Sequence, residues 1–280
     1  MTERTIRACV IGWPIAHSRS PMIHGYWLKK YGIAGSYTRQ PVRPEEVAAF
    51  LGSLRERGLA GCNVTIPHKE AAFAAAAERS AAARAVGAAN TLWLEDGRLA
   101  ADNTDSFGFI SHLRASVPGF EARGCAVAVL GAGGSSRAVV HAVLDAGAAE
   151  VRVFNRTRER ADAVARHFGA RVKPHDWAER VDRTREVRLL VNATSLGMTG
   201  APVLDMDLAQ LCEECVVFDL VYVPLETPLL AAARARGLAA VDGLGMLLHQ
   251  ATPGFEKWFG VRPEVTPDLR ALVAADIGSG

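Results

Sequence analysis

The chain has 280 residues, which is enough for one large domain or two domains of ordinary size. Its 49% hydrophobic and 22% charged residues are typical of a folded globular protein and exclude an intrinsically disordered one. The net charge of +2 is too small to favour nucleic acid or an anionic membrane as the main partner.

The cysteines and the distribution of apolar residues indicate the cellular compartment. The first residues contain no apolar signal core, and no run of about 18 apolar residues follows anywhere. The five cysteines are widely spaced, which fits reduced thiols in a cytosolic enzyme. Cys212 and Cys215 form a C-x-x-C pair, but the sequence offers no second pair or nearby histidines for zinc. We therefore expect a soluble, cytoplasmic protein without a metal site, either a monomer or a homodimer.

The first part of the chain predicts strands that alternate with helices. Apolar, β-branched runs mark the strands, and prolines and glycines mark the helix starts and stops. Asp96-Gly97 is the signal of a two-residue hairpin turn. In chain order, we expect strands at 6–11, 35–40, 63–66, 89–94 and 99–101, and helices at 21–31, 44–57, 69–80 and 106–116.

A hydroxyl-rich loop follows the first predicted strand. It contains Ser18 and Ser20, and Ser20 is placed to cap a helix that has Pro21 at its first position. Hydroxyls and helix-start N–H groups then lie together just beyond a strand, which suits a carboxylate. The alternative interpretation of Ser20 is a helix cap and nothing more.

A lysine follows the third predicted strand. The run Gly61-Cys-Asn-Val-Thr-Ile-Pro-His-Lys69 is a short β-branched strand that stops at Pro67 and puts Lys69 on the first turn of an alanine-rich helix. Strand-to-helix corners are where α/β proteins place their chemistry. A cation is mildly unfavourable at a helix N-terminus, so Lys69 is a candidate functional residue rather than only a solvated surface charge.

The second part of the chain begins with a nucleotide-binding pattern. The run 126–130 is a continuous apolar strand, as in a sheet that is covered on both faces. Gly131-Ala132-Gly133-Gly134 and Ser135 follow at once, and then come a helix to about Leu144 and a strand at 151–154. This order is the context that a dinucleotide-binding fold requires. Ser136 takes the third glycine position of the fingerprint and is small enough for close helix packing.

The end of the strand at 151–154 indicates which dinucleotide binds. An NAD site expects Asp or Glu there to bond the ribose hydroxyls. This chain has Asn155, Arg156 and Thr157 instead, with Arg160 one turn further along. Because a guanidinium can bind a phosphate bidentately and stack on adenine, we expect NADP(H).

Further loops are predicted on the same side of this sheet. Strands at 188–191 and 215–219 end in the loops 192–198 and 221–224. Helices are expected from Thr227, from the run 242–250 and near 267–275. Because the helix at 242–250 is expected to return to the first domain, that domain is discontinuous. The sequence thus predicts an α/β substrate domain at 1–105 with 247–280, and a Rossmann dinucleotide-binding domain at 106–246.

Taken together, these segments resemble the shikimate dehydrogenase family over nearly the whole chain. The motifs that carry the resemblance are Gly12–Pro21, Gly61–Lys69, Ala89–Leu92, Asn103–Asp105, Gly131–Gly134, Asn155–Thr157, Asn192–Ser195, Asp219–Tyr222 and Gly243–Gln250. Any one of them is weak evidence, whereas all of them in this order are very specific.

The resemblance implies a two-domain NADP-dependent oxidoreductase that reversibly reduces 3-dehydroshikimate to shikimate, a step of chorismate and aromatic amino-acid biosynthesis. It implies Lys69 and Asp105 as the catalytic residues. The residues implied for the substrate are Ser18, Ser20, Thr65, Lys69, Asn90, Asp105, Tyr222 and Gln250. Those implied for the cofactor are Gly131, Ala132, Gly133, Gly134, Ser135, Asn155, Arg156, Thr157, Arg160, Thr194, Ser195, Met198, Val221, Gly243 and Met246.

The resemblance has two small departures and leaves alternatives open. Ser106 stands where the family usually has glycine, and Ser135-Ser136 replaces a small apolar pair, so Ser106 could alter the turn after Asp105. The alternatives are a quinate/shikimate dehydrogenase that prefers NAD, a folate dehydrogenase of similar layout, and a non-catalytic ligand sensor. Asn155-Arg156-Thr157 argues against the first, and the pair Ser18 and Ser20 together with Gln250 argues against a bulky pterin. A sensor is disfavoured because the catalytic lysine and aspartate are both present.

Overall fold

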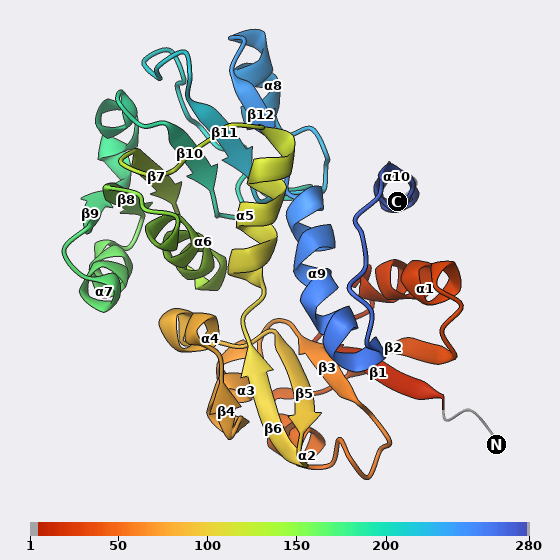
Figure 1. Ribbon diagram of the computed structural model, residues 1–280. Coiled ribbons are helices and arrows are strands. Elements are labelled where there is room, and N and C mark those ends of the chain that lie inside the picture. Colours follow the sequence, from red (N-terminus) through yellow and green to blue (C-terminus); the bar gives the residue numbers. More distant parts are fainter. Residues whose placement is uncertain (1–4, 279–280) are drawn as a thin grey trace. The chain divides into compact units, whose positions relative to one another are not determined.

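The computed structural model describes residues 5–278, which divide into two compact units (Figure 1). The first unit comprises Leu248–Val273 and the described residues up to Asp105, and the second comprises Ser106–Leu247 and the described residues after Val273. Each unit contains its own six-stranded sheet. In the described part of the chain, no helix combines the length and the apolar character needed to cross a membrane.

The first unit is built on a mixed sheet with the strand order β2-β1-β3-β5-β6-β4. Its strands are β1 (Ile6–Gly12), β2 (Gly35–Pro41), β3 (Gly61–Val64), β4 (Glu78–Arg79), β5 (Thr91–Glu95) and β6 (Arg98–Asp102). Its helices are α1 (Ser20–Lys30), the 3-10 helix η1 (Pro44–Glu46), α2 (Val47–Gly52), α3 (Lys69–Ala75), α4 (Ala81–Val86), and parts of α9 (Leu244–Phe259) and α10 (Pro267–Gly278).

Pairing in this sheet brings several chain segments to one edge. β3 runs parallel to β1 and antiparallel to β5, and β5 runs antiparallel to β6. The carboxyl ends of β1, β3 and β6 therefore meet at the same edge as the start of β5. The segments that follow β1, β3 and β6 and that precede β5 carry the hydroxyl loop, Lys69, Asp105 and Asn90, respectively.

The two faces of this sheet differ in character. Cys62 and Leu92 point into an apolar cluster with Phe50 and Ala72 from the α2 and α3 side. Side chains alternate along a strand, so Asn63 and Thr91, which pair across β3 and β5, point to the opposite face. There the aromatic rings of α1 and α9 gather, and these polar residues are buried. Buried polar side chains need partners, so the face with α1 and α9 is where a polar network has to form.

The second unit has an all-parallel sheet with the strand order β12-β11-β10-β7-β8-β9. Its strands are β7 (Ala126–Leu130), β8 (Glu150–Asn155), β9 (Val172–Asp176), β10 (Leu189–Asn192), β11 (Val216–Asp219) and β12 (Ala239–Val241). Its helices include α5 (Asp105–Ser116, in this unit from Ser106), α6 (Gly134–Asp145), α7 (Arg158–Phe168) and α8 (Pro228–Ala235), with the 3-10 helices η2 (Trp177–Arg180) and η3 (Asp182–Thr184).

Both faces of this sheet are covered, as the apolar run at 126–130 predicts. Val127 and Val129 lie in one core cluster with side chains of α5, α6 and α7. Ala128 and Leu130 lie in a second cluster with side chains of α8. Alternate side chains of β7 therefore pack into two different cores, which is why the strand has no polar residues.

The predicted helix at 69–80 is wrong in its second half. α3 ends at Ala75, where Ala76 adopts an extended conformation, and β4 then adds to the edge of the sheet beside β6. The Arg79 guanidinium donates to the carbonyl oxygens of Phe73 and Ala74 at 2.6 and 2.9 Å. A side chain downstream of the helix therefore ends it, and alanine content alone does not reveal such a contact.

Other local predictions need smaller corrections. The N-cap position of α1 is Arg19, without a side-chain cap, so Ser20 is not the cap but the first helical residue. The predicted helix at 44–57 is only η1 and α2 followed by turns. The strands β4, β9 and β12 were not expected. The hairpin at Asp96-Gly97 is confirmed, with φ of +49° and +78° at the two turn residues.

Candidate active site

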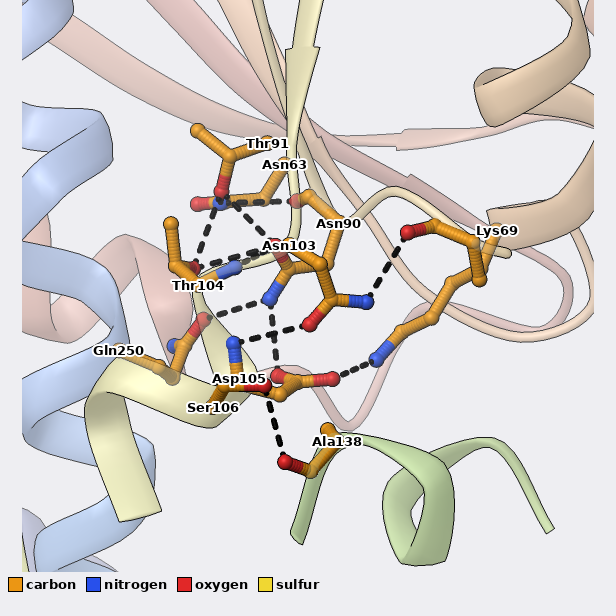
Figure 2. Close-up of polar contacts among 11 residues, drawn as sticks. Asn63, Lys69, Asn90, Thr91, Asn103, Thr104, Asp105, Ser106, Ala138 and Gln250 are labelled. Atoms are coloured by element: carbon orange, nitrogen blue, oxygen red, sulfur yellow. Dashed lines mark hydrogen bonds and ion pairs between the residues drawn. The ribbon is translucent and has the colours of Figure 1, made fainter. Parts of the chain in front are cut away.

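The lysine and the aspartate that the sequence singles out lie together in the first unit. Lys69 Nζ donates to Asp105 Oδ2 at 2.6 Å (Figure 2). The Asp105 side chain is 10% exposed and that of Lys69 is 24% exposed, so the carboxylate is enclosed while the ammonium still reaches solvent. A charge-assisted hydrogen bond of this length between largely buried partners fixes the ammonium in one place.

Backbone contacts hold Lys69 at this position. The ring of the preceding residue, His68, is buried, and its Nε2 lies 2.7 Å from the carbonyl oxygen of Val42. The carbonyl oxygen of Lys69 accepts from the backbone N–H of Ala89 at 2.9 Å. The first turn of α3 is therefore tied to the segment that leads to Asn90, so the lysine is positioned from both sides.

Asn90 binds the other oxygen of the aspartate. Its Nδ2 donates to Asp105 Oδ1 at 2.8 Å and reaches Gln250 Oε1 at 3.4 Å (Figure 2). Its Oδ1 accepts from the backbone N–H and hydroxyl of Thr104 at 2.8 and 3.1 Å, and from the hydroxyl of Thr91 at 3.1 Å. With three donors on the oxygen, the amide has only one satisfied orientation, and that orientation turns its N–H groups toward Asp105.

Residues that the sequence reasoning passed over complete this network. The backbone N–H of Asp105 donates to Asn103 Oδ1 at 3.2 Å, and Asn103 Nδ2 donates to the carbonyl oxygen of Ala88 at 3.0 Å. Asn63 donates to Thr91 Oγ1 and to the carbonyl oxygen of Asn90, both at 3.1 Å. A signal was available: a buried strand rarely carries Asn or Thr without partners, and Asn63 lies in the middle of one.

The hydroxyl loop lies near the Lys69 corner because β1 and β3 are neighbouring parallel strands. The backbone N–H of Trp13 donates to the carbonyl oxygen of Ile66 at 3.1 Å, and the backbone N–H of Thr65 donates to the carbonyl oxygen of Ile11 at 3.0 Å. These two bonds tie the loops together. Within the loop, Ser20 N donates to Ser18 Oγ at 3.3 Å.

Two neighbours of this loop escaped the sequence analysis. Arg39 Nε and Nη2 donate to the Ser18 carbonyl oxygen at 2.8 and 2.6 Å, which places a cation beside the loop. A Cβ on Gly12 would lie 2.6 Å from the Thr65 methyl group, so glycine is required where the two loops approach each other.

Ser106, the departure after Asp105, has a partner of its own. Its buried hydroxyl donates to the carbonyl oxygen of Ala138 in α6 at 2.9 Å (Figure 2). The extra hydroxyl is therefore satisfied within the second unit, and α5 begins at Asp105 as a regular helix.

The glycine turn of the second unit has the form of a phosphate site. Gly131 has φ of +106°, and a Cβ there would lie 3.1 Å from the Ala193 carbonyl oxygen, so glycine is required. A Cβ on Gly133 or Gly134 would meet nothing within 4 Å, so these positions leave open space beside the first turn of α6. Ser136 is fully buried, and its hydroxyl accepts from Gly133 N at 3.2 Å, which explains how serine replaces the third glycine. Exposed Ser135 follows at the same helix start, which suits a pyrophosphate.

The end of β8 carries free cations and no carboxylate. Arg156 and Arg160 are exposed, and their guanidinium groups have no hydrogen bond or ion pair within residues 5–278. Arg158 is different, because it pairs with Asp162 and Asp176 at 3.0 and 3.3 Å. Asn155 Nδ2 donates to the Thr157 carbonyl oxygen at 2.8 Å and fixes the turn. This set of groups fits the ribose phosphate of NADP better than the bare ribose of NAD.

A buried aspartate organises the remaining loops of this unit. Asp219 Oδ1 accepts from Asn192 Nδ2 and Val221 N at 2.9 and 3.0 Å, and its Oδ2 accepts from Thr227 at 2.7 Å. Asn192 in turn accepts from the backbone N–H and hydroxyl of Thr194. Burial raises the pKa of Asp219 to about 6, although these hydrogen bonds oppose the rise. One side chain thus fixes the loops after both β10 and β11.

The other residues predicted for the cofactor differ in what they offer. Ser195 and Met198 are exposed, whereas Met246 is 8% exposed and packs in the core with Val127 and Val129. A Cβ on Gly243 would lie 2.2 Å from the Leu220 carbonyl oxygen, so this glycine has a packing reason as well. The half-buried Tyr222 belongs to the second unit, whereas the other residues predicted for the substrate belong to the first.

The C-x-x-C pair combines a buried cysteine with a partly buried one. Cys212 and Cys215 are free thiols whose Sγ atoms contact the Val187 and Val216 carbonyl oxygens. Burial raises the pKa of Cys215 to about 12, which keeps it a thiol. Within residues 5–278, no group of three or more His, Cys, Asp or Glu side chains is arranged to bind a metal.

Three family profiles match this chain in sequence. The shikimate dehydrogenase substrate-binding domain matches residues 10–92, the shikimate/quinate 5-dehydrogenase profile matches residues 115–221, and the shikimate 5'-dehydrogenase C-terminal domain matches residues 243–273. A shikimate dehydrogenase (NADP(+)) from Azorhizobium caulinodans is 56% identical over 273 residues, which cover 98% of this chain and 97% of that protein. The chain belongs to the shikimate dehydrogenase family.

Solved structures agree with this family. Shikimate 5-dehydrogenase from Thermus thermophilus in complex with NADP(H) and shikimate is 40% identical, with a TM-score of 0.85, over 98% of this chain and all of that one. Quinate dehydrogenase from Corynebacterium glutamicum in complex with NAD is 30% identical, with a TM-score of 0.88, over 97% and 99% of the two chains. The fold is thus shared by relatives that differ in substrate and in cofactor, so both choices depend on individual residues.

Proposed function

We propose that this protein is an NADP-dependent shikimate dehydrogenase that reversibly reduces 3-dehydroshikimate to shikimate. The observation that carries the proposal is the Lys69–Asp105 pair, with the ammonium 2.6 Å from one carboxylate oxygen and Asn90 on the other. The identity to curated NADP(+)-dependent relatives extends over 98% and 99% of this chain and so includes both units.

The pair can perform the proton half of a ketone reduction. Bound NADPH supplies a hydride to the carbonyl carbon, and the electron pair displaced onto the carbonyl oxygen needs a proton. The Lys69 ammonium donates that proton, and its 24% exposure lets solvent replace it afterwards. The ionised Asp105 carboxylate can accept hydrogen bonds but cannot donate them, so it orients the ammonium and has lone pairs left for a substrate hydroxyl.

We assign the remaining polar groups of the first unit to substrate recognition. Ser18, Ser20 and Thr65 lie in the two tied loops and suit the carboxylate, and Asn90 and Gln250 suit ring hydroxyls beside Asp105. A site built from such groups rejects analogues that lack the hydroxyls, because its own buried polar atoms would then lose their partners.

We assign cofactor binding to the second unit. The open glycine turn and the first turn of α6 suit the pyrophosphate, and Arg156, Thr157 and Arg160 suit the 2'-phosphate. The other residues assigned to the cofactor are Ala132, Ser135, Asn155, Thr194, Ser195, Met198, Val221, Gly243 and Met246. Tyr222 remains a prediction for the substrate carboxylate.

The reaction places the protein in aromatic amino-acid biosynthesis through chorismate, and we assign it to the cytoplasm. All five cysteines are free thiols, which accords with a reducing compartment. We assign the first unit to the substrate domain and the second to the cofactor domain. The sequence predicts 1–105 with 247–280 and 106–246 for these domains, but Leu247 and the described residues after Val273 pack with the second unit.

The test is a four-way assay of the purified protein, with shikimate or quinate as substrate and NADP+ or NAD+ as cofactor, followed by the absorbance of the reduced nicotinamide. We expect shikimate with NADP+ to give the highest kcat/KM. Equal or better turnover of quinate with NAD+ would move the protein to the quinate dehydrogenases. The Lys69→Ala variant is the negative control for contaminating dehydrogenases.

A further inference from the structure

A continuous run of buried hydrogen bonds leads from β2 to the Lys69–Asp105 pair. The Tyr37 hydroxyl donates to Asn63 Oδ1 at 2.6 Å, and Asn63 Nδ2 donates to Thr91 Oγ1 at 3.1 Å. Thr91 then donates to Asn90 Oδ1 at 3.1 Å, and Asn90 Nδ2 donates to Asp105 Oδ1 at 2.8 Å. Counting backbone and side chain together, no residue from Tyr37 to Asp105 in this run is more than 7% exposed.

Every hydrogen bond in this run points the same way. Each member accepts on an oxygen and donates to the next, and the sequence of donors ends on a carboxylate that can only accept. Hydrogen bonds aligned head to tail polarise one another, and the effect is larger where water is absent. The run cannot carry a proton as a relay, because it passes through two amide groups, so its role is to orient and polarise.

The first donor, Tyr37, is held by aromatic packing. The Tyr37 ring stacks on His24 at a centroid distance of 3.9 Å and an interplanar angle of 9°, and Trp258 lies 5.8 Å away. Burial raises the pKa of Tyr37 well above its usual value, and the neighbouring Cys9 and Cys62 add to the rise. A hydrogen bond from Ser20 opposes it. The phenol therefore stays a donor throughout the working pH range and is linked to the hydroxyl loop as well.

We propose that Tyr37 is a positioning residue of the reaction, acting through Asn63, Thr91 and Asn90 to orient the Asp105 carboxylate toward Lys69. This inference rests on the proposed function and adds to it a residue outside the contact set assigned to the substrate. Without the phenol, Asn63 Oδ1 becomes a buried acceptor that has lost its donor, while the amide still donates to Thr91 Oγ1 and to the Asn90 carbonyl oxygen. The Asn63 side chain then shifts to recover a partner, and this shift and the lost polarisation pass through Thr91 and Asn90 to the carboxylate, which holds Lys69 less firmly.

The test compares Tyr37→Phe with the matched control Tyr26→Phe. Tyr26 also donates or accepts a single side-chain hydrogen bond in the first unit, to Thr266 at 3.2 Å, but it lies outside the run. We expect Tyr37→Phe to lower kcat for shikimate about 5–20-fold with KM changed less than about 3-fold, as removal of one buried donor implies. Tyr26→Phe should leave both within about 2-fold.

A double-mutant cycle separates positioning from simple destabilisation. In a Lys69→Ala background the run has no lysine to orient, so Tyr37→Phe should lower kcat by less than about 2-fold. An equal loss in both backgrounds, an unchanged kcat for Tyr37→Phe alone, or a matching loss for Tyr26→Phe overturns the proposal.

A spectroscopic arm does not depend on activity. The side-chain amide signals of Asn90 in the ¹⁵N–¹H spectrum of the ligand-free protein should move in Tyr37→Phe and stay in place in Tyr26→Phe. If wild-type protein turns over no shikimate, the proposed function fails while this arm still tests the hydrogen-bonded run. If the Asn90 signals do not move, the run fails even when the enzyme is active.

Discussion

The two units solve the problem of placing polar groups in opposite ways. In the first unit, side chains such as Asn90 and Asp105 form a buried network in which each atom has an assigned partner. In the second, the groups offered to a ligand are backbone N–H groups at the start of α6 and the exposed arginines Arg156 and Arg160. A network of side chains selects a small hydroxylated molecule by exact pairing, whereas helix starts and cations bind phosphates through charge. Single substitutions should therefore affect kcat in the first unit and binding in the second.

The sharpest test of this contrast is Lys69→Ala. Loss of the proton donor should lower kcat by about 10²–10⁴ while KM for shikimate changes only a few-fold. Asp105→Asn should also lose most of its kcat, because the amide cannot hold the ammonium as the carboxylate does. The measurement is steady-state kinetics, with Lys257→Ala as control, since Lys257 lies over the Trp93 ring away from the pair. A rise in KM with unchanged kcat would make Lys69 a binding residue.

In the second unit, Arg156→Ala should change binding and not chemistry. We expect it to weaken the affinity for NADPH by about 10²–10³-fold, which corresponds to about 3–4 kcal/mol of binding free energy. The affinity for NADH should stay nearly unchanged. Fluorescence titration of each cofactor measures this directly. Arg158→Ala is the matched control, because Arg158 already pairs with Asp162 and Asp176. Equal losses for both cofactors in Arg156→Ala would show that this arginine does not recognise the phosphate.

The two units should also respond to acid with opposite signs. In the first unit His24 is fully buried, and burial lowers its pKa from 6.5 to about 3. The unfolded chain binds a proton below pH 6.5 and the native unit does not, so stability falls as the pH falls below 6.5. Between pH 6.5 and 4.5 this removes about 2–3 kcal/mol of unfolding free energy.

His24→Leu should abolish that loss, whatever its effect on stability at neutral pH. Urea unfolding followed by tryptophan fluorescence reports on this unit, because Trp27 packs against His24. The exposed His17 is the control, since His17→Leu should leave the pH slope unchanged. An unchanged slope in His24→Leu would mean that the imidazole is not held neutral by burial.

In the second unit, Asp219 should give a smaller effect of opposite sign. Its pKa is raised from 3.8 to about 6, so its contribution is complete below pH 3.8 and is lost as the pH rises through 6. Between pH 4.5 and 6 this amounts to about 1.5 kcal/mol. The free energy of unfolding of Asp219→Asn should therefore rise relative to that of the wild type as the pH rises. The fluorescence of Trp177, the tryptophan of this unit, follows the transition, and a constant difference between the two proteins would contradict the assignment.

The glycine turn and the helix that begins at Lys69 show how much of the local structure the sequence could predict. The turn at 131–134 is determined locally, because a positive φ at Gly131 and a helix start at Gly134 need only neighbouring residues. The end of α3 was wrongly predicted because Arg79, beyond the helix, caps its last carbonyl groups. The N-cap of α1 was misplaced by one residue, which local pattern cannot resolve. Short edge strands such as β4 also carry too little pattern to be seen.

By itself, the sequence determined the family, the two α/β units and the residue types at the strand ends. The family follows from the resemblance of its ordered motifs, whereas the units and the strand ends follow from hydrophobic alternation and turn chemistry, which act over a few residues. Only the tertiary structure decided how Asn90 is oriented and that Tyr37 and Asn63 lead to Asp105. It also decided that the Leu92 carbonyl oxygen and the Trp258 ring leave no room for a side chain at Gly61. Hydrogen-bond direction and close packing join residues that are distant in the chain, so they exist only once the sheet has set its register.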